Sequence, residues 1–581
     1  MIDSTPMLPG LSPVAGKRIA AQFDGGLLSS DAGVLVLREI EQRLRVAERL
    51  ATCVVDPRVP ELVTHGLADI IRFRLLMIAA GHEDGNDANS LRIDPVFKMA
   101  HDLAPSERDL CSQSTISRLE NLPDARALLR MGRAMVDLYC ESFKQVPRRI
   151  TLDIDDTFDA VHGGQQLRLF NAHYDEYGFQ PIVVFDGDGR FITAVLRPAK
   201  RPGGKEIRGF LRRLLRAIRA NWPRVEILLR GDSHYCCPEV LDFCRARKVD
   251  YILGVAPTPT LRSHILDLET RVKARYDTTA KQGKVRGFSE FFDGAKSWSR
   301  VERIIARIEA GSEGADTRFI VTSLEKSNAR RLYEDVYCRR GQAENHIKSW
   351  KTHLAADRTS CTKASANQFR LFLHAGAYWL MWGLRQSMPR RSMWRVAQFD
   401  TLRLRLIRIG FKVVFKGEGD GLSTVKVRLC GLSNKSRPQR GAQMQIFFSR
   451  APHGSENRAA SFGLFSDKLG VGMQGFRIFQ FFHQFGADQF YRGERRAQFM
   501  RGAGRQRAER DHPLRLQRLL AGGRQIPIAL AQAARDAGHK QRHAARTDQK
   551  AVPHTPQVQA HAVHVLLVVG KGLIKEHQRG I

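Results

Sequence analysis

Apolar side chains recur at helical spacing through the first quarter of the chain. In segments 30–51, 67–81 and 124–143 they return every three or four residues. This period is typical of helices that bury one face. The pattern predicts a mainly helical region between residues 30 and 146.

A shorter helix is expected within 111–122, between the second and third of these segments. Its start is rich in serine and threonine, and Arg118 lies one turn further on. Such a helix start can contact phosphate groups and base edges of DNA. An ordinary capped surface helix has the same pattern, so the sequence leaves both interpretations open.

From residue 149 the apolar period changes from helical to alternating. The positions 150, 152 and 154 are apolar, which puts Asp153 and Asp155 together on the polar face of a half-buried strand. Two strands joined by a tight turn at Asp186–Gly189 are expected next. A basic amphipathic helix, a short buried strand that ends at Asp232, a helix and a final strand complete the series. The order strand, strand, strand, helix, strand, helix, strand predicts an α/β domain.

The pattern is less regular in 257–318, which we interpret as a β-rich insert. Strands at 301–310 and 317–324 then lead into a helix that contains residues 337–351. Segment 371–384 is strongly apolar, but His374 and Gly376 interrupt it. It is too short for a membrane span and is predicted to be a buried core helix.

The charge of the chain points to a polyanionic partner. Lys and Arg number 93 against 60 Asp and Glu, a net charge of +33 over 581 residues. Such an excess suits nucleic acid, although an acidic membrane surface or a basic tail would also explain it. Residues 411–581 carry 29 basic and 11 acidic residues, and thus more than half of this excess.

Cysteine usage and the chain start indicate the compartment. The nine cysteines have no regular spacing, and the closest group, Cys236, Cys237 and Cys244, lacks the paired spacing of a zinc site. Reduced, mostly buried thiols fit a cytosolic protein. No signal peptide and no membrane span are recognised.

The helix over 337–351 concentrates chemistry on one face. Tyr337, Arg340, Glu344 and Lys351 are separated by three, four and seven residues. At about 100° per residue they share a stripe about 60° wide, with Lys348 at its edge. A solvated, ion-paired helix face would look the same.

Two aspartates on the predicted sheet suggest a functional interpretation of that stripe. Asp155 lies on the first strand, and Asp232 lies at the C-terminal end of the fourth. If these strands are neighbours, both carboxylates meet at one sheet edge, where sites of open α/β sheets form. With Glu344 they could hold two Mg²⁺ or Mn²⁺ ions for phosphodiester chemistry. Asp153 and Asp156 are expected to have structural roles.

If such a metal site acts on DNA, the cations and the phenol of the stripe can contact the same DNA. Arg340 and Lys351 can grip phosphates. Tyr337 can hydrogen-bond a phosphate or stack on a base.

These motifs resemble the DDE transposases of bacterial insertion sequences, most closely the group numbered 1380. Tyr337, Arg340, Glu344 and Lys351 match every position of the Y-R-E-K signature around the third catalytic acid. "LDIDDT" resembles the first-aspartate motif and selects Asp155, and "RGDSHY" resembles the second and selects Asp232. Segment 81–98 is similar to the N-terminal part of the family. The resemblance spans roughly residues 20–410.

The resemblance implies an RNase H-like mixed-sheet core with a β-rich insert, a helical N-terminal domain and an irregular basic tail. The implied catalytic and metal-binding residues are Asp155, Asp232 and Glu344, with two Mg²⁺ (or Mn²⁺) ions. Tyr337, Arg340, Lys348, Lys351 and Arg118 would contact DNA. The expected domains are 1–147 (helical, DNA-binding), 148–256 (first part of the core), 257–318 (insert), 319–411 (remainder of the core) and 412–581 (tail).

The implied activity is cutting and joining DNA at transposon ends. The partners would be terminal inverted repeats and target DNA, bound by a homodimer on paired ends in the bacterial cytoplasm, associated with the nucleoid. Two alternatives stay open: an RNase H-like nuclease without strand transfer, and a catalytically silent protein that occupies transposon ends.

The sequence departs from the family pattern after about residue 412. An Arg/Gln/Gly-rich tail with few acids replaces the short end expected there. Translation from a shifted reading frame is the favoured explanation, and a genuine basic DNA-binding extension is the other.

Overall fold

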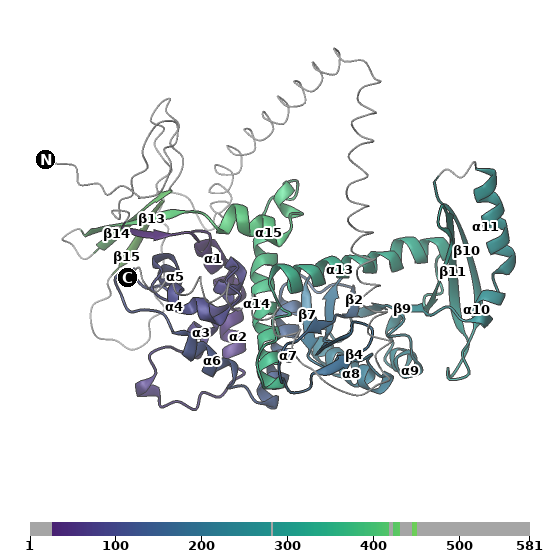
Figure 1. Ribbon diagram of the computed structural model, residues 1–581, viewed down its shortest axis with the longest axis horizontal. Helices are drawn as coiled ribbons and strands as arrows, with labels where there is room; N and C mark the ends of the chain where they lie inside the picture. The colour runs from purple at the N-terminus through teal and green to yellow at the C-terminus, as the bar shows by residue number, and fades with distance from the viewer. Residues whose placement is uncertain (1–25, 280–282, 418–421, 430–443, 450–581) are drawn as a thin grey trace, which may run out of the picture. The chain divides into compact units, whose positions relative to one another are not determined.

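The computed structural model describes residues 26–279, 283–417, 422–429 and 444–449 (Figure 1). Its first part is helical, as the apolar period predicts. The helices are α1 (Val34–Leu44), α2 (Val46–Ala51), α3 (Leu67–Ala80), α4 (Ala88–Leu91), α5 (Pro95–Ala100), α6 (Gln113–Glu120) and α7 (Ala125–Glu141), with 3₁₀ turns at Pro60–Leu62 and Gly85–Asp87.

One predicted helix is in fact two. The segment 30–51 is broken between α1 and α2 by Arg45, whose φ of 52° is left-handed. Its backbone N–H still bonds the carbonyl oxygen of Glu41 and closes the end of α1. Apolar spacing continues across the break, so the period alone could not reveal it.

A mixed eight-stranded sheet forms the centre of the second part. Its order is β10-β11-β12-β9-β8-β2-β6-β7. Strands β2, β8 and β9 are parallel to one another, whereas β6 and β7 on one side and β12, β11 and β10 on the other pair antiparallel. The strands are β2 (Arg149–Asp156), β6 (Ile182–Asp186), β7 (Phe191–Val195), β8 (Glu226–Gly231), β9 (Asp250–Val255), β10 (Val285–Asp293), β11 (Glu302–Gly311) and β12 (Gly314–Thr322).

The predicted strands and helices of this domain occur in the predicted order, with further strands between the first two. Helix α8 (Gly204–Asn221) connects β7 to β8, and α9 (Pro238–Ala246) connects β8 to β9. The β6–β7 turn closes as expected: Gly189 has a φ of 79°, and Asp186 Oδ1 accepts the backbone N–H groups of Asp188 and Arg190.

Two parts of this domain were not predicted. A small sheet of order β3-β5-β4 stands between β2 and β6, built from β3 (Asp159–Ala160), β4 (Leu169–Asn171) and β5 (Glu176–Phe179). The segment expected to be a β-rich insert also contains helices α10 (Pro259–Ser263) and α11 (Leu266–Thr278).

The strands of that segment continue the main sheet. β12 pairs with β9 from Phe319↔Val255 to Thr322↔Ile252. Helix α11 packs on β10 and β11 through Val272, which belongs to a separate apolar cluster with Ile304. The hairpin therefore lengthens the sheet and adds a core of its own.

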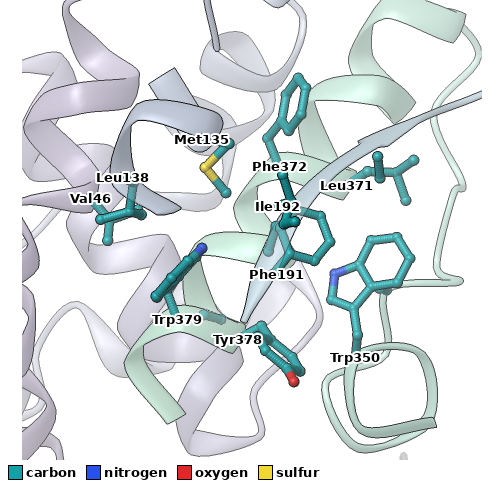
Figure 2. Packing of buried hydrophobic residues seen from close by; sticks show 14 of the residues in the cluster. Val46, Met135, Leu138, Phe191, Ile192, Trp350, Leu371, Phe372, Tyr378 and Trp379 are labelled. Atoms are coloured by element: carbon teal, nitrogen blue, oxygen red, sulfur yellow. The ribbon is translucent and has the colours of Figure 1, made fainter. Parts of the chain in front are cut away.

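Helix α14 (Ala364–Ser387) forms the centre of the main apolar core. It is buried over most of its length, which confirms the prediction for 371–384. Tyr378 and Trp379 of α14 lie among side chains of the helical region and of β7, including Met135 and Phe191 (Figure 2). A Cβ at Gly376 would lie 2.7 Å from a Leu75 methyl, so only glycine permits this approach to α3. None of the helices described here is long and apolar enough to cross a membrane.

The helix of the signature is irregular. After α12 (Ala329–Arg331) the chain runs through a π-helical turn (Leu332–Tyr337), a 3₁₀ turn (Cys338–Arg340), α13 (Gly341–Lys348) and a second π-helical turn (Ser349–His353). A constant 100° per residue therefore does not hold across it. The last helical elements are a 3₁₀ turn (Met393–Arg395), α15 (Phe399–Leu402) and a π-helical turn (Arg403–Ile407).

The start of the predicted irregular tail contains strands. β1 (Leu27–Ser29) pairs with β13 (Phe411–Gly417), which pairs with β14 (Leu422–Leu429), and β14 pairs with β15 (Met444–Ser449). This pairing differs from the prediction for the first part of 412–581. Residues 450–581, and with them most of the expected basic tail, lie outside the described residues.

Candidate active site

The two candidate aspartates, Asp155 and Asp232, lie at the same edge of the sheet, which we call the acidic edge. β2 and β8 are adjacent and parallel, in register from Arg149↔Glu226 to Asp153↔Arg230. Asp155 is near the C-terminal end of β2, and Asp232 directly follows β8. The condition set by the sequence, that these strands are neighbours, is confirmed.

Asp155 is a largely buried carboxylate beside a guanidinium. Its Oδ2 lies 3.1 Å from Arg340 Nη1, its Oδ1 accepts the backbone N–H of Asp156 at 2.9 Å, and 13% of its side chain is exposed. Burial raises the pKa of Asp155 to about 7, and the nearby charge of Asp232 adds to the rise, against the opposing effect of Arg340. The ionised form of such a buried carboxylate is stabilised by a positive charge beside it.

Asp232 shares its surroundings with a histidine that sequence reasoning missed. Asp232 Oδ1 accepts the backbone N–H of His234 at 2.9 Å. The ring Nδ1 of His234 lies 3.4 Å from Asp156 Oδ1 and 3.9 Å from Asp232 Oδ2. The hydrogen bond with Asp156 raises the pKa of His234, with a smaller contribution from Asp232. The signal in the sequence was its place two residues after Asp232.

Tyr337 and Arg340 face the same edge. The guanidinium of Arg340 lies 5.9 Å from the ring centroid of Tyr337. Burial raises the pKa of Tyr337, and Asp232 is among the charges that add to this rise. Gly254 on β9 leaves room for the phenol, because a Cβ there would lie 2.8 Å from the hydroxyl oxygen.

Among the described contacts, Glu344 is connected to the aspartates only through Arg340, which contacts both Glu344 and Asp155. Its Oε1 lies 3.5 Å from Arg340 Nη2, and 67% of its side chain is exposed. Lys348, one turn further along α13, is exposed as well. The structure therefore brings Asp155, Asp232, Tyr337 and Arg340 together and leaves the two exposed residues at the margin.

The predicted stripe puts Lys351 on one helix face with Glu344, but in the structure Lys351 contacts other residues. Its Nζ lies 3.1 Å from Oδ1 of the buried Asp159 and 3.4 Å from Thr157 Oγ1, and it also donates to the carbonyl oxygen of Phe158. Burial raises the pKa of Asp159 to about 7 although Lys351 opposes this. Lys351 thus ties the signature helix to β3, just beyond Asp155.

Asp153 is held in a buried ion pair. Arg230 donates Nε and Nη2 to its two carboxylate oxygens at 2.6 and 2.7 Å, and 2% of Asp153 and 5% of Arg230 are exposed. Arg230 Nη1 also donates to the carbonyl oxygen of Val336 at 2.8 Å. The pair therefore anchors the residue before Tyr337, which agrees with the structural role expected for Asp153.

Arg118 stands apart from these groups. It is exposed on α6, which packs against α3 and α14, and no contact with the acidic edge is found in the part of the chain that the structure describes.

The donor chemistry of the edge fits a hard divalent cation in part. Asp155 and Asp232 offer oxygen ligands, which Mg²⁺ and Mn²⁺ prefer. The raised pKa of Asp155 reports a buried carboxylate that a cation would stabilise. Within the described ranges, no three His, Cys, Asp or Glu side chains are grouped to hold a metal. Glu344, the third predicted acid, contacts Arg340.

Comparison with known proteins gives one family. The family model described as "Transposase DDE domain group 1" matches residues 11–429. A cryo-EM structure of the piggyBac transposase synaptic complex with hairpin DNA matches with 12% sequence identity and a TM-score of 0.32, covering 65% of this chain and 80% of that one. No curated protein matches the sequence.

Proposed function

The chain belongs to group 1 of the transposases with a DDE domain, and we propose that it binds the ends of an insertion sequence and cuts and joins DNA there. The observation that carries the proposal is the meeting of Asp155 and Asp232 at one sheet edge, with Arg340 of the signature helix bonded to Asp155.

The strand order supports an RNase H-like core. From β7 through β6, β2 and β8 to β9 the sheet consists of an antiparallel meander followed by two parallel strands reached through α8 and α9. This arrangement is the order expected for such a core, with the first acid on its first strand and the second acid after its fourth. The remaining strands extend the sheet beyond it.

Asp155, Asp232 and Glu344 are proposed to hold two divalent ions. Such an ion pair, when bound, activates the attacking oxygen and stabilises the leaving oxygen at a phosphodiester. The positions of Asp155 and Asp232 at the ends of the adjacent strands β2 and β8 support this role. Glu344 would join them when a DNA phosphate competes with the carboxylates for Arg340, because guanidinium binds phosphate in two parallel hydrogen bonds.

The residues around the acids are proposed to position DNA. Arg340 and Tyr337 would contact the phosphate or base next to the cleaved bond, and Lys348 lies exposed one turn beyond Glu344. Lys351 would contact DNA near its ion pair with Asp159. Arg118 on α6 would contact DNA away from the cleaved bond.

The experiment is cleavage and joining of a labelled transposon-end duplex in Mg²⁺ or Mn²⁺, with wild type compared with Glu344→Gln. Glutamine keeps the size of the side chain and removes its charge. Cleavage and joining by the wild type that vanish in the variant, with DNA binding retained, support the proposal. Equal cleavage in both refutes Glu344 as a metal ligand.

One observation favours a second candidate, a silent protein that binds transposon ends. Glu344 is exposed and separated from the aspartates by Arg340. Binding without cleavage in either protein would establish this candidate. Cleavage without joining would instead indicate a nuclease of the same fold.

A further inference from the structure

Helix α8 presents a row of cations that the candidate active site does not use. Its single acid, Glu206, is turned toward Arg197, whose Nε lies 2.9 Å from Glu206 Oε1. The opposite, apolar side of α8 is buried in the core through residues such as Ile207 and Leu214. The exposed cations are Lys205, Arg208, Arg212, Arg213 and Arg216, which we call the α8 basic row.

The spacing of this row puts its charges on one side of the helix. Lys205, Arg208, Arg212 and Arg216 follow one another at intervals of three, four and four residues, which are neighbouring positions on a helix surface. Like charges at such intervals destabilise a helix. The row therefore costs stability unless an anion neutralises it.

The fold supplies no such anion within the described part of the chain. None of the five side chains forms an ion pair or a side-chain hydrogen bond there. Glu239 of α9, whose carboxylate lies against Gly204 at the start of α8, forms no ion pair with the row among the described residues. Other acids on the neighbouring helices have other partners. Asp137 of α7 accepts from Arg133 at 2.9 Å, and Asp242 of α9 pairs with Arg245.

The row begins beside the acidic edge. Arg201, just before α8, donates Nη2 to the carbonyl oxygen of Ser233 at 2.9 Å, and Ser233 follows Asp232. Because α8 returns the chain from β7 to the start of β8, the row leads away from that edge. From Lys205 to Arg216 the helix rises about 17 Å.

We propose that the α8 basic row binds the phosphate backbone of duplex DNA that extends outward from the candidate active site. The inference rests on the proposed function and adds a second contact surface to it. Duplex DNA carries one negative charge for about 1.7 Å of axis, so about 17 Å of duplex carries roughly ten phosphates on its two strands, and the row would meet those on the side that faces it. Guanidinium groups suit phosphate oxygens in geometry as well as in charge.

The structure argues against a membrane as the partner. A helix that binds a lipid surface inserts its apolar face, whereas the apolar face of α8 is buried in the protein core. The exposed side of the row carries no aromatic residue, which excludes base stacking as its main interaction. Backbone phosphates are left as the groups that it fits.

The test is the salt dependence of binding to a duplex of several helical turns and arbitrary sequence, measured without metal on the full chain. The variant is Arg208→Gln/Arg212→Gln/Arg216→Gln. The matched control is Arg262→Gln/Arg271→Gln/Arg275→Gln, which removes the same charge from exposed positions of α10 and α11.

Each lost phosphate contact reduces the slope of log affinity against log salt by about 0.9. Three lost contacts mean that, between about 50 and 200 mM salt, the wild type loses about 40-fold more affinity than the row variant. The control should keep the slope of the wild type. A triple Arg→Lys variant at 208, 212 and 216 should keep it as well, because it retains the charges.

An unchanged slope in the row variant, or equal losses in the row variant and the control, would overturn the proposal. A row variant that loses binding to polyglutamate but not to the duplex would overturn it in favour of an acidic peptide. If the triple variant melts early, the three single Gln variants replace it, each with a slope reduced by about 0.9.

The test of DNA binding by the row and the test of DNA cleavage can fail independently of each other. A wild type that never cleaves DNA refutes the proposed function, yet a reduced slope in the row variant still establishes the contact. A wild type that cleaves while the slopes stay equal refutes the contact alone.

Discussion

The buried ion pair of Asp153 and Arg230 should stabilise the fold and position the signature helix at the same time. Both side chains are almost fully buried and make two hydrogen bonds of 2.6 and 2.7 Å. Removing one partner leaves an uncompensated buried charge. Asp153→Asn is therefore expected to lower the free energy of unfolding by about 3–5 kcal/mol.

A double variant separates the two roles. Replacing a buried pair with apolar residues of similar volume is often neutral or stabilising, so Asp153→Leu/Arg230→Met should recover most of the lost stability. It still lacks the hydrogen bond from Arg230 to the Val336 carbonyl oxygen. DNA cleavage should therefore remain low in the double variant, because Tyr337 and Arg340 lose their anchor.

The assay is urea unfolding followed by tryptophan fluorescence, with hydrogen exchange of residues 332–340 as the readout of the anchor. Lys273→Met removes an exposed i,i+4 ion pair with Glu269 on α11 and should change the free energy of unfolding by no more than about 0.5 kcal/mol. Suppose that Asp153→Asn unfolds like the wild type but loses metal-dependent cleavage. Asp153 would then act around the metal, and the reasoning from burial would be wrong.

Three further predictions concern the site and its pH dependence. Gly254→Ala, which puts a Cβ 2.8 Å from the Tyr337 hydroxyl oxygen, should lower DNA cleavage at least about tenfold, whereas Gly209→Ala, with open space at its Cβ, should not. The pKa of Asp159 is about 7 in the folded chain, above its unfolded value, so its contribution to stability is present at low pH and is lost as pH rises from about 4 to 7. Asp159→Asn should flatten that fall in urea titrations at several pH values, and an unchanged profile would contradict it. Lys351→Met removes the cation that lowers this pKa and should extend the fall above pH 7.

The acidic edge could be predicted from the sequence because it depends on local pattern and strand order. Alternation around Asp155 marked a strand, and the short apolar run before Asp232 marked another. That the two strands are neighbours was a condition which the sequence left open and the structure meets. These signals are periods of two and about 3.6 residues, which a single sequence displays directly.

The contacts of individual side chains could not be predicted in this way. Ideal helical geometry put Lys351 on one stripe with Glu344, but π-helical and 3₁₀ turns interrupt the helix, and Lys351 pairs with Asp159 of a small sheet that the sequence did not reveal. Likewise, His234 joins the site through a loop contact that has no periodic signal.

The end of the family pattern was also placed too early. The sequence suggested a departure after about residue 412, whereas the family model extends to residue 429 and the structure pairs β13 and β14 there. Strand pairing with β1, nearly four hundred residues earlier in the chain, is a long-range contact that local composition does not encode.

The central claim is that the carboxylates of Asp155 and Asp232 bind the catalytic metal ions. Its most direct test is a change of ligand: cleavage of a labelled transposon-end duplex by Asp155→Cys and Asp232→Cys, with Mg²⁺ compared with Mn²⁺. A thiolate is a poor ligand for Mg²⁺ and a better one for Mn²⁺. We predict that both variants are inactive in Mg²⁺ and regain cleavage in Mn²⁺, whereas wild type cleaves in both. Cleavage by the variants in Mg²⁺ at the wild-type rate would contradict the claim.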